Sequence, residues 1–447
     1  MPWQYTLEEL AGIVGAAPPD RNPIFSTVST DTRTLCPGQV FFALHGDRFD
    51  GASFLAEAFA KGAAAAVAPR PHSGGPCLVV SDPLAALQTF AAHHRARYAI
   101  PIIAITGSCG KTTAKDLIAA VLATKYRVVK SPGNFNNAIG CPLSLLGIEP
   151  ETDIAVVELG ANHLGEIARL CGWVRPTEAA VTMVAPAHLE GFGTIDNVAK
   201  AKAEILQALP PHGVFYLNTD DERCVRMAAS FDGTVVRFGH SGDVRFERCS
   251  FEPGRDMMLD VAPIGTLHLP LQCPAHATNA LLAIAVGLQH DIESFEAPLR
   301  EACATSERCK VSRIGPLEVI DDTYNANPAS VAAALDTLAA RTAATARIAV
   351  LGDMLELGDA APDLHRWVGR YAGKTHVTHL FATGTHAPDT VAGAIAGGVP
   401  NTAVFERHSE AAQAIREVAK IGDVALVKGS RGMHMEAVIA LLRNLYG

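Results

Sequence analysis

The chain has 447 residues, 49% of them hydrophobic, and a formal net charge of -9 at pH 7. At about 100–200 residues per domain, this length predicts two to four domains. The acidic balance disfavours a nucleic-acid-binding surface. The sequence contains no run of about 18 apolar residues, so it predicts no membrane span. The first five residues lack the basic and then apolar layout of a signal peptide, so we expect no secretion signal, and the ten cysteines form no CxxC pair. We therefore expect a cytoplasmic protein with reduced thiols and no structural zinc.

Residues 1–98 predict a mixed α/β domain. Its clearest strand is the apolar run at residues 38–44, and Gly46, Asp50 and Gly51 then supply turn chemistry. We treat this region as the first of three domains.

Residues 99–312 predict a central domain with a mainly parallel sheet. A short apolar run at 102–106 ends in Gly107, and a helical stretch with one apolar face follows it. Further strand-like runs lie at 154–159, 179–184 and 214–217, and Ala/Leu-rich helical periodicity spans 275–287. Alternating strands and helices indicate a doubly wound, P-loop ATPase-like sheet.

Residues 313–447 predict a C-terminal Rossmann-like domain. Its strand-like runs alternate with helical stretches and lie at 317–320, 348–351, 379–382 and 424–427. The whole chain is therefore expected to be α/β, with three domains.

A phosphate-binding loop is predicted where the strand at 102–106 meets its helix. Its sequence, TGSCGKTT at 106–113, offers backbone N–H groups and a helix N-terminus to an anion. Ile105 stands where the generic motif has its first glycine, so a simple glycine-rich turn is the alternative interpretation. The residues that we expect to bind nucleotide phosphate here are Gly107, Ser108, Gly110, Lys111, Thr112 and Thr113, with the Thr112 hydroxyl also a magnesium ligand.

Several ordered segments resemble motifs of the Mur ligase family, and together they cover essentially the whole chain. In the central region these are GNFNNAIGCPL (133–143), VELGAN (157–162), APAHLEGFG (185–193) and AKAKAEI (199–205). In the third region they are DDTYNANP (321–328), LGDMLELG (351–358) and VKGSRGM (427–433). The DDxYNANP pattern is typical of the family member that adds D-alanyl-D-alanine to UDP-N-acetylmuramoyl-tripeptide.

The resemblance implies an ATP-dependent ligase whose partners are UDP-N-acetylmuramoyl-tripeptide and D-alanyl-D-alanine. ATP phosphorylates a substrate carboxylate, and the amine of the second substrate attacks the acyl phosphate. The substrate carboxylate and the ATP triphosphate are both anions, so magnesium and cationic side chains must neutralise their charge. We expect two magnesium ions. The residues implied for catalysis are Lys111, Glu158, His188 and Lys202, and those implied for metal binding are Thr112, Glu158, His188 and Lys202 as a carbamate.

The carbamate needs a choice between two lysines. Lys200 and Lys202 are about 200° apart on a helix, so only one can face the site. The family match selects Lys202, whose amine would combine with CO₂ to give an anion. The alternative is that Lys202 is an ordinary solvent-exposed lysine on the helix.

The remaining site residues are also carried over from the resemblance, and each could instead have a plain structural role. We expect Asn279, Arg308 and Asp322 to contact nucleotide, whereas His276 is left without a role because its spacing departs from the family pattern. The residues expected to bind the other two substrates are Asp31, Arg33, Gly51, Asn134, Asn136, Asn137, Asn325, Asn327 and Lys428. Asp31 and Arg33 could equally form a capped turn. We expect a monomer.

Three alternatives remain open. A sibling ligase would add diaminopimelate or lysine and should carry another signature in place of YNANP. A folylpolyglutamate synthase would lack a UDP-sugar domain of this kind. A nucleotide-gated switch would need the phosphate loop, but not Glu158, His188 and Lys202 together.

Overall fold

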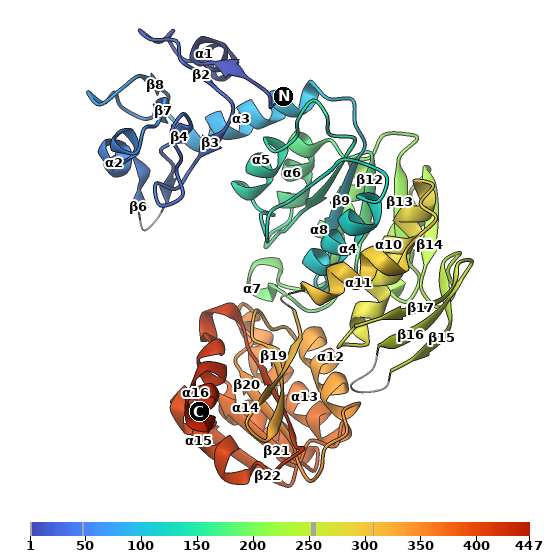
Figure 1. Ribbon diagram of the computed structural model, residues 1–447. Helices are drawn as coiled ribbons and strands as arrows, with labels where there is room; N and C mark the ends of the chain where they lie inside the picture. The colour runs from blue at the N-terminus through green and yellow to red at the C-terminus, as the bar shows by residue number, and fades with distance from the viewer. Residues whose placement is uncertain (1, 47–48, 252–255, 307) are drawn as a thin grey trace.

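The computed structural model describes residues 2–46, 49–251, 256–306 and 308–447. The chain forms three lobes in sequence order, with the N-terminal lobe blue, the central lobe teal to yellow and the C-terminal lobe orange to red (Figure 1). Among the described helices, none is both long and apolar enough to cross a membrane.

The N-terminal lobe is built on a four-stranded parallel sheet in the order β3-β4-β7-β8. The apolar run predicted at 38–44 contains β4. The strands are β1 (Tyr5–Thr6), β2 (Ile24–Phe25), β3 (Val28–Ser29), β4 (Val40–Phe42), β5 (His45–Gly46), β6 (Phe49–Asp50), β7 (Ala65–Ala68) and β8 (Cys77–Val79); the helices are α1 (Leu7–Val14), η1 (Gly51–Phe54), α2 (Leu55–Ala60) and α3 (Pro83–Ala96).

Helix α3 joins this lobe to the central one. Asp82 caps its first turn by accepting a hydrogen bond from the Leu84 N–H at 2.8 Å, and Pro83 suits the first helical position. Trp3 donates its indole N–H to the Leu146 carbonyl at 2.8 Å, and one hydrophobic core runs through both lobes. The two lobes therefore share a core across α3.

Arg95 on α3 is the charged residue that ties this junction together. It is 6% exposed and donates to the carbonyls of Ile100, Val174 and Arg175 at 3.0–3.3 Å. Arg95→Ala should lower the free energy of unfolding by about 3 kcal/mol or more, because several buried carbonyls lose a charged donor. Urea denaturation would measure this loss. The control is Arg97→Ala, at an exposed neighbour that lies 4.8 Å from the Tyr5 ring, and it should lower the free energy of unfolding by about 1 kcal/mol or less. Equal losses for the two variants would contradict the interpretation.

The central lobe has the predicted parallel sheet, and its six strands lie in the order β10-β11-β9-β12-β13-β14. Helices α4 and α10 pack on one face, and α5, α6 and α8 on the other. Its elements are β9 (Ile102–Thr106), α4 (Lys111–Leu122), β10 (Val128–Lys130), α5 (Gly140–Leu145), β11 (Ile154–Glu158), α6 (Glu166–Val174), β12 (Glu178–Val181), α7 (Leu189–Phe192), α8 (Ile195–Gln207), β13 (Val214–Asn218), α9 (Glu222–Ala228), β14 (Thr234–Phe238), α10 (Ala275–Gln289) and α11 (Glu296–Ala304).

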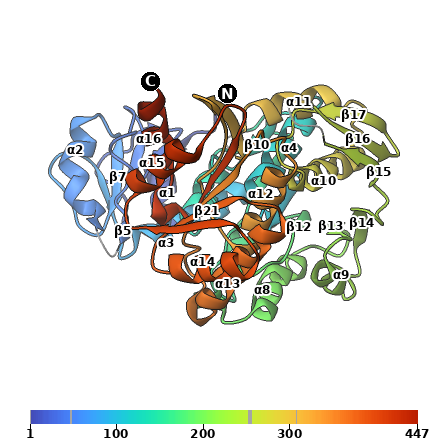
Figure 2. The same cartoon turned by 90° about the horizontal axis from the view of Figure 1, so that it is seen from below.

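A separate antiparallel sheet extends the central lobe. It consists of β15 (Arg245–Ser250), β16 (Met257–Ala262) and β17 (Gly265–Leu269), and it lies at the side of the lobe near α11 (Figures 1 and 2). The sequence interpretation did not predict it. Strand β15 is largely exposed, and four of its six residues are charged or polar, so it lacks the apolar signal of the parallel strands.

The C-terminal lobe is a six-stranded sheet in the order β18-β19-β23-β20-β21-β22, parallel except for β18. Helices α12, α13 and α14 cover one face, and α15 and α16 the other. Its elements are β18 (Lys310–Ile314), β19 (Leu317–Asp322), α12 (Pro328–Ala339), β20 (Arg347–Gly352), η2 (Gly358–Ala360), α13 (Ala361–Lys374), β21 (His379–Thr383), α14 (Ala387–Ala396), β22 (Asn401–Phe405), α15 (His408–Val418), β23 (Val424–Lys428), η3 (Arg431–Met433) and α16 (Glu436–Tyr446).

The predicted boundary between residues 312 and 313 falls inside strand β18. This strand pairs with β19 from Lys310 onward, and a tight turn at Gly315, whose φ is 57°, joins the two strands. The C-terminal sheet therefore begins three residues earlier than the predicted boundary.

Candidate active site

A cleft of 1170 Å³ separates the central and C-terminal lobes. Its central wall is made by the loops after β9, β11 and β12, which place side chains beyond the carboxyl ends of a parallel sheet. Its other wall is made by residues 322–334 and by Lys428 and Arg431 of the C-terminal lobe. The cleft thus lies where ligands of α/β sheets are usually found.

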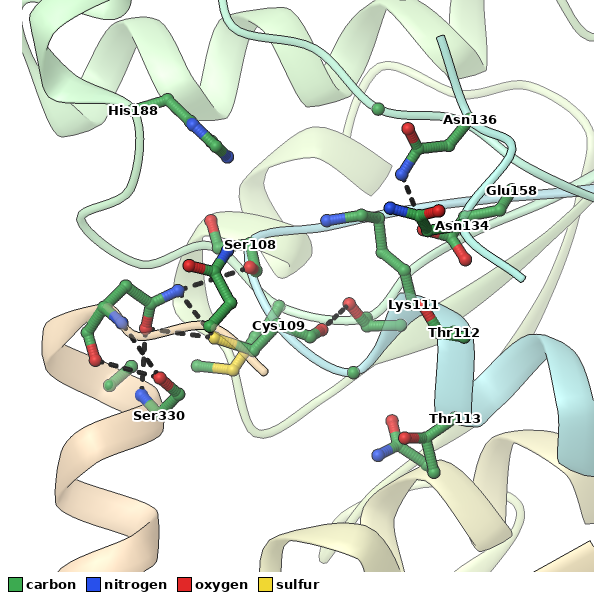
Figure 3. A pocket seen from close by; sticks show the side chains of 18 of the residues that line it. Ser108, Cys109, Lys111, Thr112, Thr113, Asn134, Asn136, Glu158, His188 and Ser330 are labelled. Atoms are coloured by element: carbon green, nitrogen blue, oxygen red, sulfur yellow. Dashed lines mark hydrogen bonds between the residues drawn. The ribbon is translucent and has the colours of Figure 1, made fainter. Parts of the chain in front are cut away.

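The predicted phosphate loop runs from the end of β9 to the start of α4, as expected. Gly107 and Gly110 have φ values of 146° and 81°, which favour glycine. Lys111 donates its ammonium to the Gly107 carbonyl at 2.8 Å, and its side chain projects into the cleft (Figure 3). The loop backbone, Lys111, Thr112 and Thr113 all line the cleft, so the predicted phosphate ligands lie together.

Gly107 has no room for a side chain. A Cβ at this position would lie 1.9 Å from Thr182 Oγ1 and 3.1 Å from the Thr182 backbone nitrogen. Gly107→Ala should therefore weaken ADP binding by roughly tenfold or more, since overpacking costs about 1–3 kcal/mol and distorts the loop. Isothermal titration would test this. Gly12→Ala, on helix α1 with open space around its Cβ, is the control and should bind ADP normally; wild-type affinity in Gly107→Ala would refute the prediction.

Glu158 ends strand β11, next to β9 in the sheet. The side chain is 1% exposed, and its Oε1 accepts a hydrogen bond from Asn136 Nδ2 at 2.8 Å (Figure 3). The other oxygen, Oε2, is buried without a hydrogen-bond partner among the described residues. A carboxylate oxygen left bare in this way is a strong candidate ligand for a cation.

The asparagine-rich loop before α5 has divided roles. Asn136 holds Glu158, whereas Asn137 Oδ1 accepts from the backbone N–H groups of Ile139 and Gly140 at 3.1 and 2.9 Å. Asn134, Asn136 and Asn137 all line the cleft. The oxygen of Asn137 is thus committed to the start of α5, and its amide nitrogen remains the group that could reach a substrate.

His188 directly precedes α7 and Lys202 lies on α8, and of the two only His188 lines the cleft. Burial lowers the pKa of the His188 imidazole, although Glu356 opposes the shift. Lys202 on α8 is 2% exposed and lies 5.5 Å from the Phe192 ring centroid, whereas Lys200 is exposed. Burial, and then the charge of Lys111, lower the pKa of Lys202 to about 7. The inward-facing lysine is the predicted one.

The nucleotide residues predicted outside the loop also reach the cleft. Asn279, at the start of α10, faces the phosphate loop so closely that a Cβ on Gly110 would lie 2.7 Å from its Oδ1. Arg308 donates to Thr112 Oγ1 at 3.4 Å and stacks on the Tyr324 ring, with 3.2 Å to the centroid. His276, left without a role, lines the cleft beside Asn279.

Asp322 and Lys428 are neighbours on β19 and β23, where their Cα atoms pair in register. Lys428 is 2% exposed and donates to Asp322 Oδ2 and, at 2.9 Å, to the Asn325 carbonyl. Lys428 therefore shapes the predicted Asn325 loop from inside, while both residues still line the cleft.

Asn327 carries the contact between this loop and the phosphate loop. Its side chain caps α12 through the Ser330 N–H at 2.9 Å, and its Nδ2 lies 3.1 Å from Cys109 Sγ and 3.4 Å from the Ser108 carbonyl. The two lobes thus touch at the phosphate loop itself.

The predicted N-terminal residues do not line this cleft. Asp31 accepts from the backbone N–H of Arg33 at 2.9 Å and pairs with its guanidinium, which holds the pKa of Asp31 down at about 2. This is the capped turn that the sequence left open, although Arg33 is 86% exposed. Gly51 is buried, and its backbone N–H donates to the Leu44 carbonyl at 2.8 Å. Their substrate role stays a prediction.

Comparison with known proteins places the chain in a family. Three family models match it: "Mur ligase family, catalytic domain" at residues 25–95, "Mur ligase middle domain" at 105–287 and "Mur ligase, glutamate ligase domain" at 307–431. The UDP-N-acetylmuramoyl-tripeptide–D-alanyl-D-alanine ligase of Bacillus subtilis is 34% identical over 95% of this chain and 94% of its own. The chain belongs to the Mur ligase family.

Solved structures agree with this assignment across all three lobes. MurF from Acinetobacter baumannii superposes with a TM-score of 0.90 at 30% identity, covering 99% of each chain. MurF from Thermotoga maritima in complex with ADP superposes with a TM-score of 0.82 at 25% identity, covering 94% of this chain and 97% of its own. This Mur ligase is therefore an ATP-dependent enzyme with the three-domain fold of its relatives.

Four residues that shape the site of this Mur ligase were missed by sequence reasoning. Thr182 bounds the phosphate loop, Tyr324 lies under Arg308, and Glu356 contacts His188 from the C-terminal lobe. Lys115 is 1% exposed and donates to the Ser131 carbonyl at 2.8 Å, tying α4 to the asparagine loop. For Lys115, the sequence did carry a signal, because a lysine stands within the apolar face of α4 and a buried lysine needs polar partners.

Proposed function

We propose that this chain joins D-alanyl-D-alanine to UDP-N-acetylmuramoyl-tripeptide with consumption of ATP, giving UDP-N-acetylmuramoyl-pentapeptide, ADP and phosphate. The observation that carries the proposal is the single cleft in which the phosphate loop, Glu158 and the YNANP loop meet. The names of the relatives that match almost the full chain support the same substrates.

The nucleotide is proposed to bind along the phosphate loop. Backbone N–H groups at the start of α4 and the Lys111 ammonium would hold its phosphates. Arg308, which contacts Thr112, adds a second cation at the loop, and Asn279 and Asp322 offer polar groups to the remainder of the nucleotide. The two cations would neutralise the triphosphate and let a carboxylate approach.

Magnesium fits the site, because Glu158 supplies a buried, unpartnered oxygen and Thr112 a hydroxyl on the same cleft. No group of three or more His, Cys, Asp or Glu side chains gathers as a complete metal site within the described ranges. Phosphate oxygens and water would therefore complete the coordination, and His188 is the third protein group in reach of the cleft. When bound, the cation neutralises charge on the phosphates.

Lys202 is proposed to carry a carbamate. Carbamate formation joins the neutral amine nitrogen to the carbon of CO₂ and releases a proton, so it requires an unprotonated lysine. Burial provides that form near neutral pH, since the pKa of Lys202 falls to about 7. A negative carbamate would also relieve the repulsion between Lys202 and Lys111.

The two reacting groups would meet between the lobes. A carboxylate oxygen of the tripeptide attacks the γ-phosphorus of ATP, and ADP leaves. The amine of D-alanyl-D-alanine then attacks the acyl carbon, losing a proton as phosphate departs. Asn325 and Asn327, shaped by Lys428, are proposed to hold the dipeptide, and Asn134, Asn136 and Asn137 the acceptor peptide. Closure of the lobes over this cleft would exclude water from the acyl phosphate.

The N-terminal lobe is proposed to hold the UDP-sugar end through Asp31, Arg33 and Gly51. Since all the proposed catalytic groups come from one chain, we also propose an active monomer. The ten cysteines are free, as we expect for a cytoplasmic enzyme.

Phosphate release from ATP tests the proposed reaction. We expect release that requires both UDP-N-acetylmuramoyl-tripeptide and D-alanyl-D-alanine, with a pentapeptide product identified by mass spectrometry. Lysine- and diaminopimelate-containing tripeptides should both be tried as acceptors. Release that needs diaminopimelate in place of D-alanyl-D-alanine would overturn the proposal in favour of a sibling ligase.

A further inference from the structure

One contact reaches His188 from the C-terminal lobe. The carboxylate of Glu356 lies in hydrogen-bond contact with His188 Nδ1. Glu356 belongs to the loop between β20 and η2, far from His188 in sequence, and it does not line the cleft. The predicted site did not include this residue.

The backbones of both segments hold the two side chains in place. The Glu190 N–H donates to the Glu356 carbonyl at 3.0 Å, and the Gly358 Cβ position lies 3.3 Å from the Glu190 Cα, so the loop packs on the start of α7. His188 and Glu356 have φ values of 53° and 62°. Non-glycine residues adopt this left-handed backbone at a cost and keep it only where their surroundings determine it. The contact is therefore set by the docking of two lobes.

The chemistry of the imidazole ring gives the contact a consequence. When Nδ1–H is donated to a carboxylate, the proton is fixed there and Nε2 keeps its lone pair. Figure 3 shows the His188 ring projecting into the cleft, toward the side of Lys111 and Glu158. Histidines that bind metals usually donate their other N–H to a carboxylate or carbonyl in this manner.

We propose that Glu356 is a positioning residue that orients His188 Nε2 toward the cleft when the C-terminal lobe is docked. The inference rests on the proposed function in taking His188 as a ligand of the divalent cation. It follows that the cation site gains its histidine in the proper tautomer only in the docked arrangement. Closure of the lobes and cation binding are thereby coupled through one hydrogen bond.

The test uses the full chain and three substitutions within residues 356–359, which span the end of this loop and the start of η2. Glu356→Ala removes the acceptor, Glu356→Gln keeps a neutral acceptor, and Asp359→Asn changes a nearby exposed carboxylate. The backbone contact to Glu190 is available to all of them, so the loop can still dock. Mn²⁺ affinity in the presence of ADP, followed by electron paramagnetic resonance, should fall roughly 10- to 100-fold in Glu356→Ala, less in Glu356→Gln and not at all in Asp359→Asn.

A second readout needs no metal. In ¹⁵N-histidine spectra of the metal-free protein, the His188 signal, identified by its loss in His188→Gln, should show the proton on Nδ1 in the wild type. The Nδ1–H tautomer should lose its preference in Glu356→Ala. Unchanged tautomer and Mn²⁺ affinity in Glu356→Ala, or a gain in affinity, would overturn the proposal.

The variant His188→Ala distinguishes the positioning role of Glu356 from the ligand role of His188 on which it rests. Weaker Mn²⁺ binding in His188→Ala but not in Glu356→Ala would leave the histidine as a ligand and reject the positioning role. Unchanged binding in both variants would reject the ligand role of His188 as well. The ligase reaction itself is tested separately, by phosphate release in the wild-type enzyme.

Discussion

Glu158→Gln should lower kcat by roughly 10²- to 10³-fold, the loss typical when one preorganised electrostatic group is removed from an active site. Glutamine keeps the shape and can still accept the hydrogen bond from Asn136. Its NH₂ group, however, would replace the bare Oε2, so a donor would stand where the cation needs an oxygen. The measurement is steady-state phosphate release with both substrates, across a range of magnesium concentrations.

Nucleotide binding without divalent cations supplies the control for this variant. The phosphate loop does not depend on the Glu158 charge for its own hydrogen bonds, so ADP affinity in a chelating buffer should match the wild type. A variant that turns over at more than half the wild-type rate would show that Glu158 is not a cation ligand. Lost ADP affinity would instead show damage to the loop.

Lys202→Ala should be nearly inactive and partly restored by bicarbonate or formate. The alanine leaves a space beside Phe192 that a small carboxylate can enter, supplying the negative charge that the carbamate would carry. Carbamate formation needs the neutral amine, so its occupancy in the wild type should fall as pH drops below about 7, the pKa of Lys202. Carbon NMR with ¹³C-bicarbonate would detect the carbamate directly.

Lys200→Ala is the matched control, because Lys200 lies on the opposite face of the same helix and is exposed. It should keep full activity and the ¹³C signal. Full activity in Lys202→Ala, or equal loss in both variants, would reject the carbamate. Activity loss without a ¹³C signal in the wild type would leave Lys202 as a cation rather than a carbamate.

Much of the fold was predictable because the parallel strands are buried on both faces. The runs at 102–106, 154–159 and 424–427 stand out as continuous apolar segments, and each contains or closely matches a strand, β9, β11 and β23. The antiparallel sheet β15–β17 escaped because its exposed residues interrupt that signal. The start of the C-terminal lobe was placed three residues late because three of the five residues of β18 are polar, so this strand has no continuous apolar run.

The candidate site was predictable where a local motif fixes geometry and less so where distant segments meet. The phosphate loop needed only its glycines and the strand and helix around it. In contrast, the Arg308–Tyr324 stack and the His188–Glu356 contact join segments from different parts of the chain. The roles of Asn136 and Asn137 also depend on which amide turns toward Glu158 and which caps α5, and sequence spacing does not determine that choice.

The contact between Asn327 and Cys109 makes the phosphate loop a natural sensor of domain movement. Burial raises the pKa of the Cys109 thiol, and Asn327 of the C-terminal lobe lies directly against its sulfur. Separation of the lobes would remove this contact and expose more of the thiol. The rate at which an alkylating reagent modifies Cys109, followed by mass spectrometry because Cys36 and Cys249 are exposed, should therefore rise with the fraction of time that the lobes are apart.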